Sequence, residues 1–287
     1  MKNIALGQYY PAESPIHRLD ARIKVILAIL YIVCTFLCKS ALGFAVLAFS
    51  AILLILLSRV PIRTVFRAIR PLLFIMIFTA AFNLFLTKGD TAPLWAWQVT
   101  EKWTVQIFEA GIYSAVFMVV RIVVLILGTS IFLTYTTTPI ALTDAIESLL
   151  SPLRVIHLPV HEFAMMMSIA LRFIPTLMEE TGKIMNAQKA RGVDFSHGSL
   201  VKRAKALVPI LIPLFVSSFR RADELATAME CRCYRGGKGR TKMRVPHLRF
   251  ADFAAVVLMV GFGSYTIINK LRCTKFFFNN YVTTFWP

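Results

Sequence analysis

Two short segments of the chain place one arginine between two small residues. They are Ala190-Arg191-Gly192 and Cys231-Arg232-Cys233. A guanidinium presents five donors in a rigid fork that suits carboxylates and backbone carbonyls, and small neighbours let a helix end enter a groove closely. We therefore predict that both segments dock onto a partner protein. Cations that complement the dipole at a helix C-terminus are an alternative explanation of the same pattern.

The rest of the chain offers little for catalysis. Its nearest match to a phosphate-binding loop, Gly236 to Thr241, lacks the first glycine at the required offset and follows no strand. A flexible basic turn after a helix explains this segment better. The five cysteines form no metal-type pair of pairs, and no Ser/His/Asp or paired-carboxylate arrangement stands out. We expect no catalytic residue, resident cofactor or metal site in this chain.

Two long amphipathic helices are predicted to carry the arginines at their ends. The first covers His161 to Ala190, about 45 Å if straight. The second covers Leu200 to Cys233, where an apolar stripe that includes Phe215 and Phe219 lies opposite charged residues. A shorter amphipathic helix is predicted from Pro139 to Leu150, with the proline at a favourable early position.

The composition places the chain in a lipid bilayer. Its 287 residues are 57% apolar and only 16% charged, unlike an ordinary soluble domain. Five apolar runs are candidates for helices that cross about 30 Å of hydrocarbon, which takes roughly twenty residues; the first two are somewhat short and the fourth is longer than one span requires. They are Val25–Cys38, Ala41–Leu57, Pro71–Thr87, Val105–Tyr135 and Ala251–Ile268. We predict an all-α integral membrane protein with about five transmembrane helices and a cytoplasmic segment that contains the two long helices.

The charge distribution predicts the orientation in the membrane. The net charge is +17, with +2 in residues 1–24, +4 in 59–70 and +8 in 139–249, whereas the linker from Lys88 to Lys102 sums to zero. By the positive-inside rule, the basic segments and the N-terminus are cytoplasmic and the neutral linker is external. In a soluble protein this charge would suggest nucleic acid. Its distribution here indicates a bilayer, so we expect no nucleic-acid partner.

These patterns divide the chain into five segments. They are a cytoplasmic N-terminal segment 1–24, a transmembrane region 25–135 with about four spans, a cytoplasmic segment 136–249, a fifth span 250–268, and a tail 269–287 without an assigned role. A row of arginines precedes the third span, at positions 59, 63, 67 and 70. The spacing of four, four and three puts them on one helical face, fit for lipid headgroups or a protein.

Several of these motifs together resemble those of a known family. The N-terminal Gly7-Gln8-Tyr9-Tyr10 and the segment from Ser14 to Arg22 are similar to its opening signature. Ala190-Arg191-Gly192 resembles its first arginine motif, and Tyr234-Arg235-Gly236-Gly237 continues the second. The family is the EcfT/CbiQ-type transmembrane (T) component of energy-coupling factor (ECF) transporters. The resemblance extends from about residue 7 to residue 268.

This resemblance implies a coupling role. Arg191 and Arg232 would insert into grooves of two ABC ATPase subunits, which would bind ATP and Mg²⁺, and the segment 136–249 would transmit their motion. Another surface would hold a substrate-binding membrane S component, for uptake of vitamins or other micronutrients across the plasma membrane of a prokaryote. Cys231 and Cys233 stand where the family usually has small residues such as alanine and glycine.

Two other classes of membrane protein remain as alternatives. A self-contained secondary transporter would normally show repeated halves with broken helices at corresponding positions, and we find neither in the sequence. An intramembrane enzyme would need convergent polar or metal-binding residues within the spans. The sequence does not identify the transported substrate, because the resemblance assigns its recognition to another subunit.

Overall fold

The computed structural model describes residues 9–38, 40–86, 95–100, 103–156, 159–193, 195, 199–237 and 249–285. They belong to two compact units. Unit 1 comprises Met1–Leu142 and Pro246–Pro287, and unit 2 comprises Thr143–Val245. Residues 1–8, which include Gly7 and Gln8 of the N-terminal signature, lie outside the described part, as do 238–248 and the last two residues of the tail.

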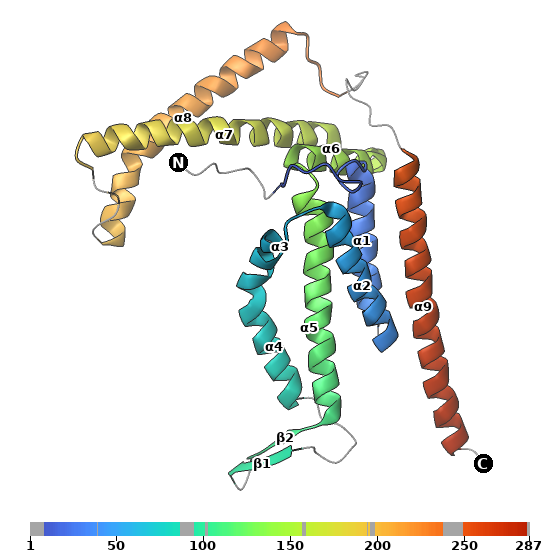
Figure 1. Ribbon diagram of the computed structural model, residues 1–287. Helices are drawn as coiled ribbons and strands as arrows, with labels where there is room; N and C mark the ends of the chain where they lie inside the picture. Colours follow the sequence, from blue (N-terminus) through green and yellow to red (C-terminus); the bar gives the residue numbers. More distant parts are fainter. Residues whose placement is uncertain are drawn as a thin grey trace. The chain divides into compact units, whose positions relative to one another are not determined.

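Unit 1 is a bundle of apolar helices around α5 (Figure 1). Its α-helices are α1 (Ala21–Leu37), α2 (Ala41–Ser58), α3 (Ile62–Ile69), α4 (Leu73–Leu86), α5 (Glu109–Thr129) and α9 (Phe250–Phe285). A 3₁₀ turn, η1 (Arg70–Leu72), joins α3 to α4, and a π-helical segment, η2 (Ser130–Tyr135), extends α5. Since α5 contacts α1, α2, α3 and α4, it is the central helix of this unit.

The apolar segments of unit 1 agree with a membrane protein. Among the described residues, three helical segments are long and apolar enough to cross a bilayer: Ile62–Phe85, Gly111–Tyr135 and Phe250–Ile268. Leu42–Ser58 is a shorter apolar helix, and α1 has only 17 residues. The first two predicted spans are thus helical but short.

The linker before α5 differs from the helical prediction. Strand β1 (Trp95–Thr100) pairs antiparallel with β2 (Trp103–Ile107), and α5 begins only at Glu109. The prediction that the fourth span begins as helix at Val105 is therefore wrong. Tryptophan and β-branched residues dominate both strands and favour extended backbone over helix.

The core of unit 1 depends on a close approach between α1 and α5. Tyr31 is fully buried, and its ring makes an edge contact with Phe132 at 6.3 Å between centroids. A Cβ at Gly128 would overlap the Tyr31 ring, so glycine is needed there for the two helices to approach. Leu27, Leu47 and other buried apolar residues complete this cluster.

The N-terminal signature forms a hydrogen-bonded cluster before α1. His17 Nε2 lies 2.9 Å from the Tyr10 carbonyl oxygen, and Nδ1 lies 2.7 Å from Ser14 Oγ. A proton on Nε2 lets the ring donate to the carbonyl and accept from the Ser14 hydroxyl. The Tyr10 N–H donates to the Tyr135 carbonyl at 3.1 Å, which joins this segment to the end of η2.

A second polar cluster joins the starts of α1 and α9. Asp252 is buried and accepts hydrogen bonds from the backbone N–H groups of Asp20 at 2.9 Å and Arg249 at 2.7 Å. Lys24 is also buried, and its Nζ donates to the Thr136 carbonyl at 2.7 Å. Burial lowers the pKa of Lys24 to about 8, although Asp252 and Asp20 partly oppose this shift. The signature thus joins the starts of α1 and α9 to the end of η2.

Unit 2 consists mainly of two long helices. The chain enters it through α6 (Pro139–Leu150), within which the division between the units falls, and through a 3₁₀ segment, η3 (Ser151–Ile156). It continues with α7 (Val160–Ala190) and α8 (Leu200–Cys231). These bounds closely match the three helices predicted for this part of the sequence.

Candidate docking site at two helix ends

The first arginine motif ends α7 in a Schellman motif. Arg191 is the C-cap residue, and Gly192 follows in the left-handed region with φ = 86°. The Gly192 N–H donates to the Lys189 carbonyl at 2.9 Å, and the Val193 N–H donates to the Gln188 carbonyl at 3.1 Å. These two bonds satisfy carbonyls that the helix end would otherwise leave unpaired.

The second motif ends α8 in the same way. Arg232 is the C-cap residue, and Cys233 takes the left-handed conformation with φ = 56°. The Cys233 N–H donates to the Glu230 carbonyl at 2.8 Å, and the Tyr234 N–H donates to the Met229 carbonyl at 3.0 Å. Cys233 therefore occupies the position that Gly192 occupies in the first motif, although a left-handed backbone is costly for a residue with a side chain.

Both predicted docking arginines are exposed. Neither the Arg191 nor the Arg232 side chain has an ion-pair or hydrogen-bond partner within the described residues. Cys231 and Cys233 are exposed free thiols beside the second arginine, and a Cβ at Gly192 would meet nothing within 4 Å. Each helix end thus presents an open surface with an exposed arginine whose side chain has no partner in the described part of the chain.

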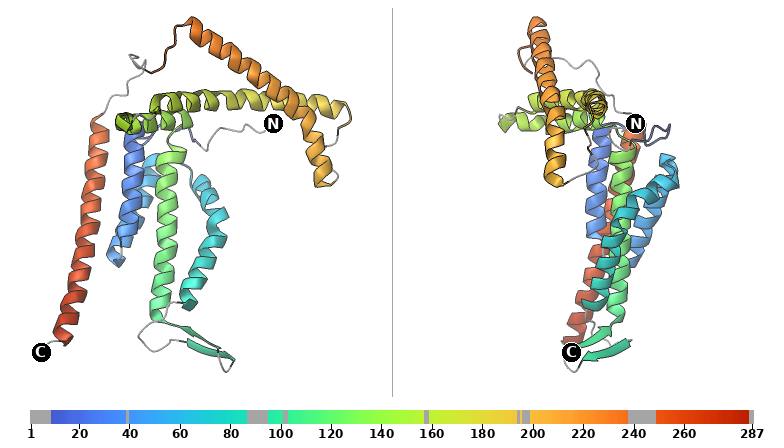
Figure 2. Two further views of the ribbon diagram at one scale, coloured as in Figure 1. Left: turned by 180° about the vertical axis from the view of Figure 1, so that it is seen from behind. Right: turned by 90° about the vertical axis from the view of Figure 1, so that its left-hand side faces the viewer.

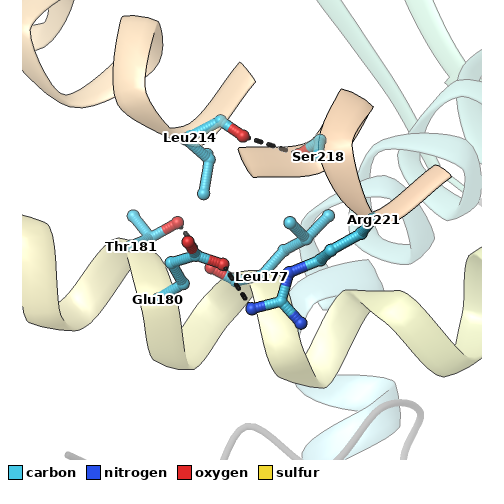
Figure 3. A network of polar contacts seen from close by, with 6 residues as sticks. All are labelled: Leu177, Glu180, Thr181, Leu214, Ser218 and Arg221. Carbon is cyan, nitrogen blue, oxygen red and sulfur yellow. Dashed lines mark hydrogen bonds and ion pairs between the residues drawn. The ribbon is translucent and has the colours of Figure 1, made fainter. Parts of the chain in front are cut away.

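The two helices meet at an ion pair that the sequence did not identify. Arg221 Nη2 of α8 donates to Glu180 Oε2 of α7 at 3.0 Å (Figure 3). On either side, the Thr181 and Ser218 hydroxyls donate to carbonyls of their own helices, so they do not compete for this carboxylate. We call this pair the crossing pair, because it marks where α7 and α8 cross (Figures 1 and 2).

The crossing pair divides each helix into two arms. Arg191 follows Glu180 by eleven residues, and Arg232 follows Arg221 by the same number, so each C-terminal arm is about 16 Å long. These arms contain no proline. The prolines of the two helices are Pro175, Pro209 and Pro213, all before the crossing pair. Because proline interrupts helical hydrogen bonds, we expect bending on the N-terminal sides of the crossing pair and stiffer arms toward the two arginines.

The apolar stripe predicted on α8 is exposed in unit 2. Leu211 is 58% exposed, Phe215 is 66% exposed and Phe219 is 57% exposed, although the last two rings pack on each other at 4.7 Å between centroids. Large apolar side chains of α7, such as Met166 and Ile174, are exposed as well. Several large apolar side chains exposed together are typical of an interaction surface.

The segment after the second motif returns to the start of α7. Gly237 packs on the ring of His161, where a Cβ would overlap the ring, and His161 Nδ1 lies 3.1 Å from Glu147 Oε1. Gly237 thus serves chain packing and Gly236 takes a left-handed conformation with φ = 88°, whereas the rest of the weak match to a phosphate-binding loop lies outside the described residues. No group of three or more His, Cys, Asp or Glu side chains that could hold a metal ion occurs in the described ranges.

The fold and the site together define a class of protein. It is a helical membrane protein with a charged helical segment in which two crossed helices end in equivalent exposed arginines. Comparison with known proteins identifies the family within this class. The model of the CbiQ family, described as cobalt transport protein, matches residues 12–243, so the chain belongs to this family.

The relatives give the role of this family member. The chain is 50% identical to an energy-coupling factor transporter transmembrane protein EcfT of Acidaminococcus fermentans over 95% of its length and 98% of the relative. It is 47% identical to the EcfT of Clostridium kluyveri over 94% of its length and 98% of the relative, and 49% identical to that of Thermosediminibacter oceani over 90% and 94%. The chain is thus a transmembrane component of an ECF transporter, a non-catalytic transport subunit.

Proposed function

We propose that Arg191 and Arg232 dock into two ABC ATPase subunits, and that α7 and α8 transmit ATP-driven motion from these subunits to a substrate-binding membrane subunit. The observation that carries this proposal is the duplication of one geometry. Two helices end in the same hydrogen-bonded cap, each presents one unpaired arginine, and both arginines are eleven residues from the crossing pair. Dipole complementarity alone requires neither the common cap nor the equal spacing.

The stiffness of the arms supports a mechanical role. When ATP brings the ATPase pair together, the two docked helix ends move, and arms without proline carry this motion to the crossing pair with little bending. Coupling requires two states whose balance ATP and substrate bias differently. The ATPases, as a homo- or heterodimer, hold ATP and Mg²⁺, so this chain needs no cofactor of its own.

The exposed apolar surface of α7 and α8 supports binding of the third component. Phe215, Phe219 and Met166 provide the apolar contacts that a membrane subunit would cover. In this proposal the chain crosses the plasma membrane of a prokaryote about five times with a cytoplasmic N-terminus, and the complex imports vitamins or other micronutrients.

Charge reversal tests the docking assignment. The full chain is co-expressed with the candidate ATPases and substrate-binding subunit, and both the ATPase recovered in mild detergent and substrate uptake are measured. Loss of a desolvated charge pair costs about 2–5 kcal/mol, so Arg191→Glu or Arg232→Glu should weaken ATPase recovery by roughly 30-fold or more. Arg220→Glu is the control, because Arg220 is an exposed arginine of α8 away from the cap.

Thiol labelling gives a second measurement on the same site. In a Cys273→Ser background, a maleimide should label the exposed Cys231 and Cys233 rapidly in the isolated chain and slowly once the ATPases are bound. Normal uptake by the Arg191→Glu/Arg232→Glu double variant would overturn the proposal. Unprotected thiols in a complex that still contains both ATPases would remove Arg232 from the interface.

A further inference from the structure

Four arginines near α3 are not used by the coupling site. Arg63 and Arg67 lie on α3 and Arg70 directly follows it, whereas Arg59 ends α2 in the left-handed conformation with φ = 55°. The prediction that all four share one helical face is therefore wrong for Arg59. Arg59, Arg63, Arg67 and Arg70 are all exposed, and none of them pairs with an acidic side chain elsewhere in the described ranges. The sequence itself has no Asp or Glu between Asp20 and Asp90. Within the described part of the chain, four positive charges therefore have no acidic partner near the start of the apolar segment Ile62–Phe85. We call these four residues the arginine row.

The helix carries an apolar stripe directly beside the row. At 100° per residue, Arg63, Arg67 and Arg70 lie within about 60° of arc. Ile62 and Phe66 flank them on one side and are 61% and 66% exposed. An exposed apolar stripe next to a cationic one is typical of a helix at the boundary between lipid headgroups and acyl chains.

Contacts within unit 1 fix the orientation of this helix. Val65, on the opposite face, is buried in a cluster with Ile16, Val60, Ile131 and Tyr135. The Tyr135 hydroxyl also donates to the Thr64 carbonyl at 3.2 Å. Because α3 is held from its inner face, the arginine row and the apolar stripe are presented outward without a folding step. The site is therefore preformed.

The surface that continues from the row is also apolar. Beyond the short turn η1, the next helix exposes Leu73, Phe74, Ile77 and Phe78, at 47% to 79% exposure. A soluble anion would match only the guanidinium groups, and an acidic protein surface would leave Phe66 and Phe74 uncovered. A ligand that matches both parts has a phosphate at one end and hydrocarbon at the other.

We propose that the arginine row binds the phosphate headgroup of an anionic phospholipid, whose acyl chains lie along the exposed face of α4. This site is separate from the docking ends of α7 and α8 and does not rest on the coupling proposal. Bound lipid would neutralise the row and anchor the start of the segment Ile62–Phe85 at the membrane surface.

The test measures lipid retention by the purified full chain. Native mass spectrometry compares phosphatidylglycerol with phosphatidylcholine, which carries the same phosphate without the net negative charge. Each arginine near an anionic surface contributes about fivefold, so Arg63→Gln/Arg67→Gln should retain phosphatidylglycerol roughly 30-fold less well. Arg63→Lys/Arg67→Lys keeps both charges and should retain most of the preference. Lys202→Gln, an exposed cation of α8, is the control and should change nothing.

Two further arms identify the source of the phosphate. Phe66→Ser should weaken phosphatidylglycerol retention by roughly tenfold through lost acyl contact, and inorganic phosphate at millimolar concentration should not displace the lipid. Equal retention of the two lipids, displacement by phosphate, or an unchanged Arg63→Gln/Arg67→Gln variant would each overturn the proposal. So would selective capture of an acidic protein without discrimination between the lipids.

Discussion

Exchanging the two charges of the crossing pair tests whether α7 and α8 work as one lever. Arg221→Glu places two carboxylates at the crossing, and Glu180→Arg places two guanidinium groups there. The double variant Glu180→Arg/Arg221→Glu restores one cation and one anion in reversed order. If the pair serves only to hold the helices together, each single variant should lose helix contact and uptake, and the double variant should regain both.

The magnitude follows from the geometry and exposure of the pair. At 3.0 Å, the attraction between unit charges is about 5.5 kcal/mol at an effective dielectric constant of 20. The side chains are 40% and 23% exposed, so solvent screening and the entropy of ordering both side chains reduce the net contribution to about 1 kcal/mol. Reversing one charge replaces attraction with repulsion, and the total loss is about 2 kcal/mol.

Two assays report this loss. Hydrogen exchange of the backbone around residues 177–181 and 218–221 should be faster in each single variant by roughly 30-fold, the equivalent of about 2 kcal/mol, and near the original rate in the double variant. ATP-driven uptake should follow the same order. Arg220→Glu is the matched control, because its ion pair with Glu224 at 3.5 Å is 80% and 69% exposed. Normal uptake by Arg221→Glu, or no recovery of uptake in the double variant, would refute the hypothesis that the crossing pair makes α7 and α8 move together.

The other predictions concern the helix cap and the buried lysine. Gly192→Ala should destabilise the α7 cap by about 0.5–1 kcal/mol. The added Cβ meets no other atom, but the free-energy cost of a left-handed alanine exceeds the stabilisation gained from a less flexible unfolded chain. Cys233→Gly should stabilise the α8 cap by a similar amount, measured as slower exchange of the Tyr234 amide. For Lys24, whose folded pKa is about 8, the unfolded chain binds more protons between pH 8 and 10.5. Thermal stability in detergent should therefore rise over that range, by no more than about 3 kcal/mol, and Lys24→Met should abolish the rise.

The cap and lysine predictions can each be contradicted by a specific result. Faster exchange of the Tyr234 amide in Cys233→Gly would contradict the cap prediction, because it would mean that the Cys233 thiol makes a contact that outweighs the backbone strain. For the lysine, the exposed Lys202→Met provides the comparison, and a wild-type stability that falls between pH 8 and 10.5 relative to Lys24→Met would contradict the assigned pKa.

Local patterns in the sequence predicted the helices well. α2 begins at Ala41 and α6 covers Pro139–Leu150, as predicted, and α7 ends at Ala190. These boundaries depend on apolar periodicity, proline and capping residues, which act within a few positions of the chain. The strands at 95–107 were not predicted, because the net charge of the linker and the hydropathy of the run that follows it do not distinguish strand from helix. Their tryptophan and β-branched residues do favour strands.

Contacts between distant residues could not be predicted in this way. Asp20 bonds to Asp252 across 232 positions, and nothing near either residue indicates the other. The crossing pair left a faint signal, because Glu180 and Arg221 carry opposite charges at the same offset from the two motif arginines. This equal spacing is informative only after both arginines are known to end their helices, because the spacing is counted from the helix ends.

The two caps also change the interpretation of the arginine motifs. From the sequence, the shared feature is an arginine between small residues, and on that basis cysteine looks like a substitute for glycine of similar size. In the structure, Gly192 and Cys233 share a positive φ, and Arg191 and Arg232 share the C-cap position. What the two motifs have in common is therefore a backbone turn that ends the helix directly after an outward-facing guanidinium. The residue at the turn can therefore differ between the two motifs if it adopts the left-handed conformation. Cys233 does so at a conformational cost of about 1–2 kcal/mol and thereby preserves the geometry of the site.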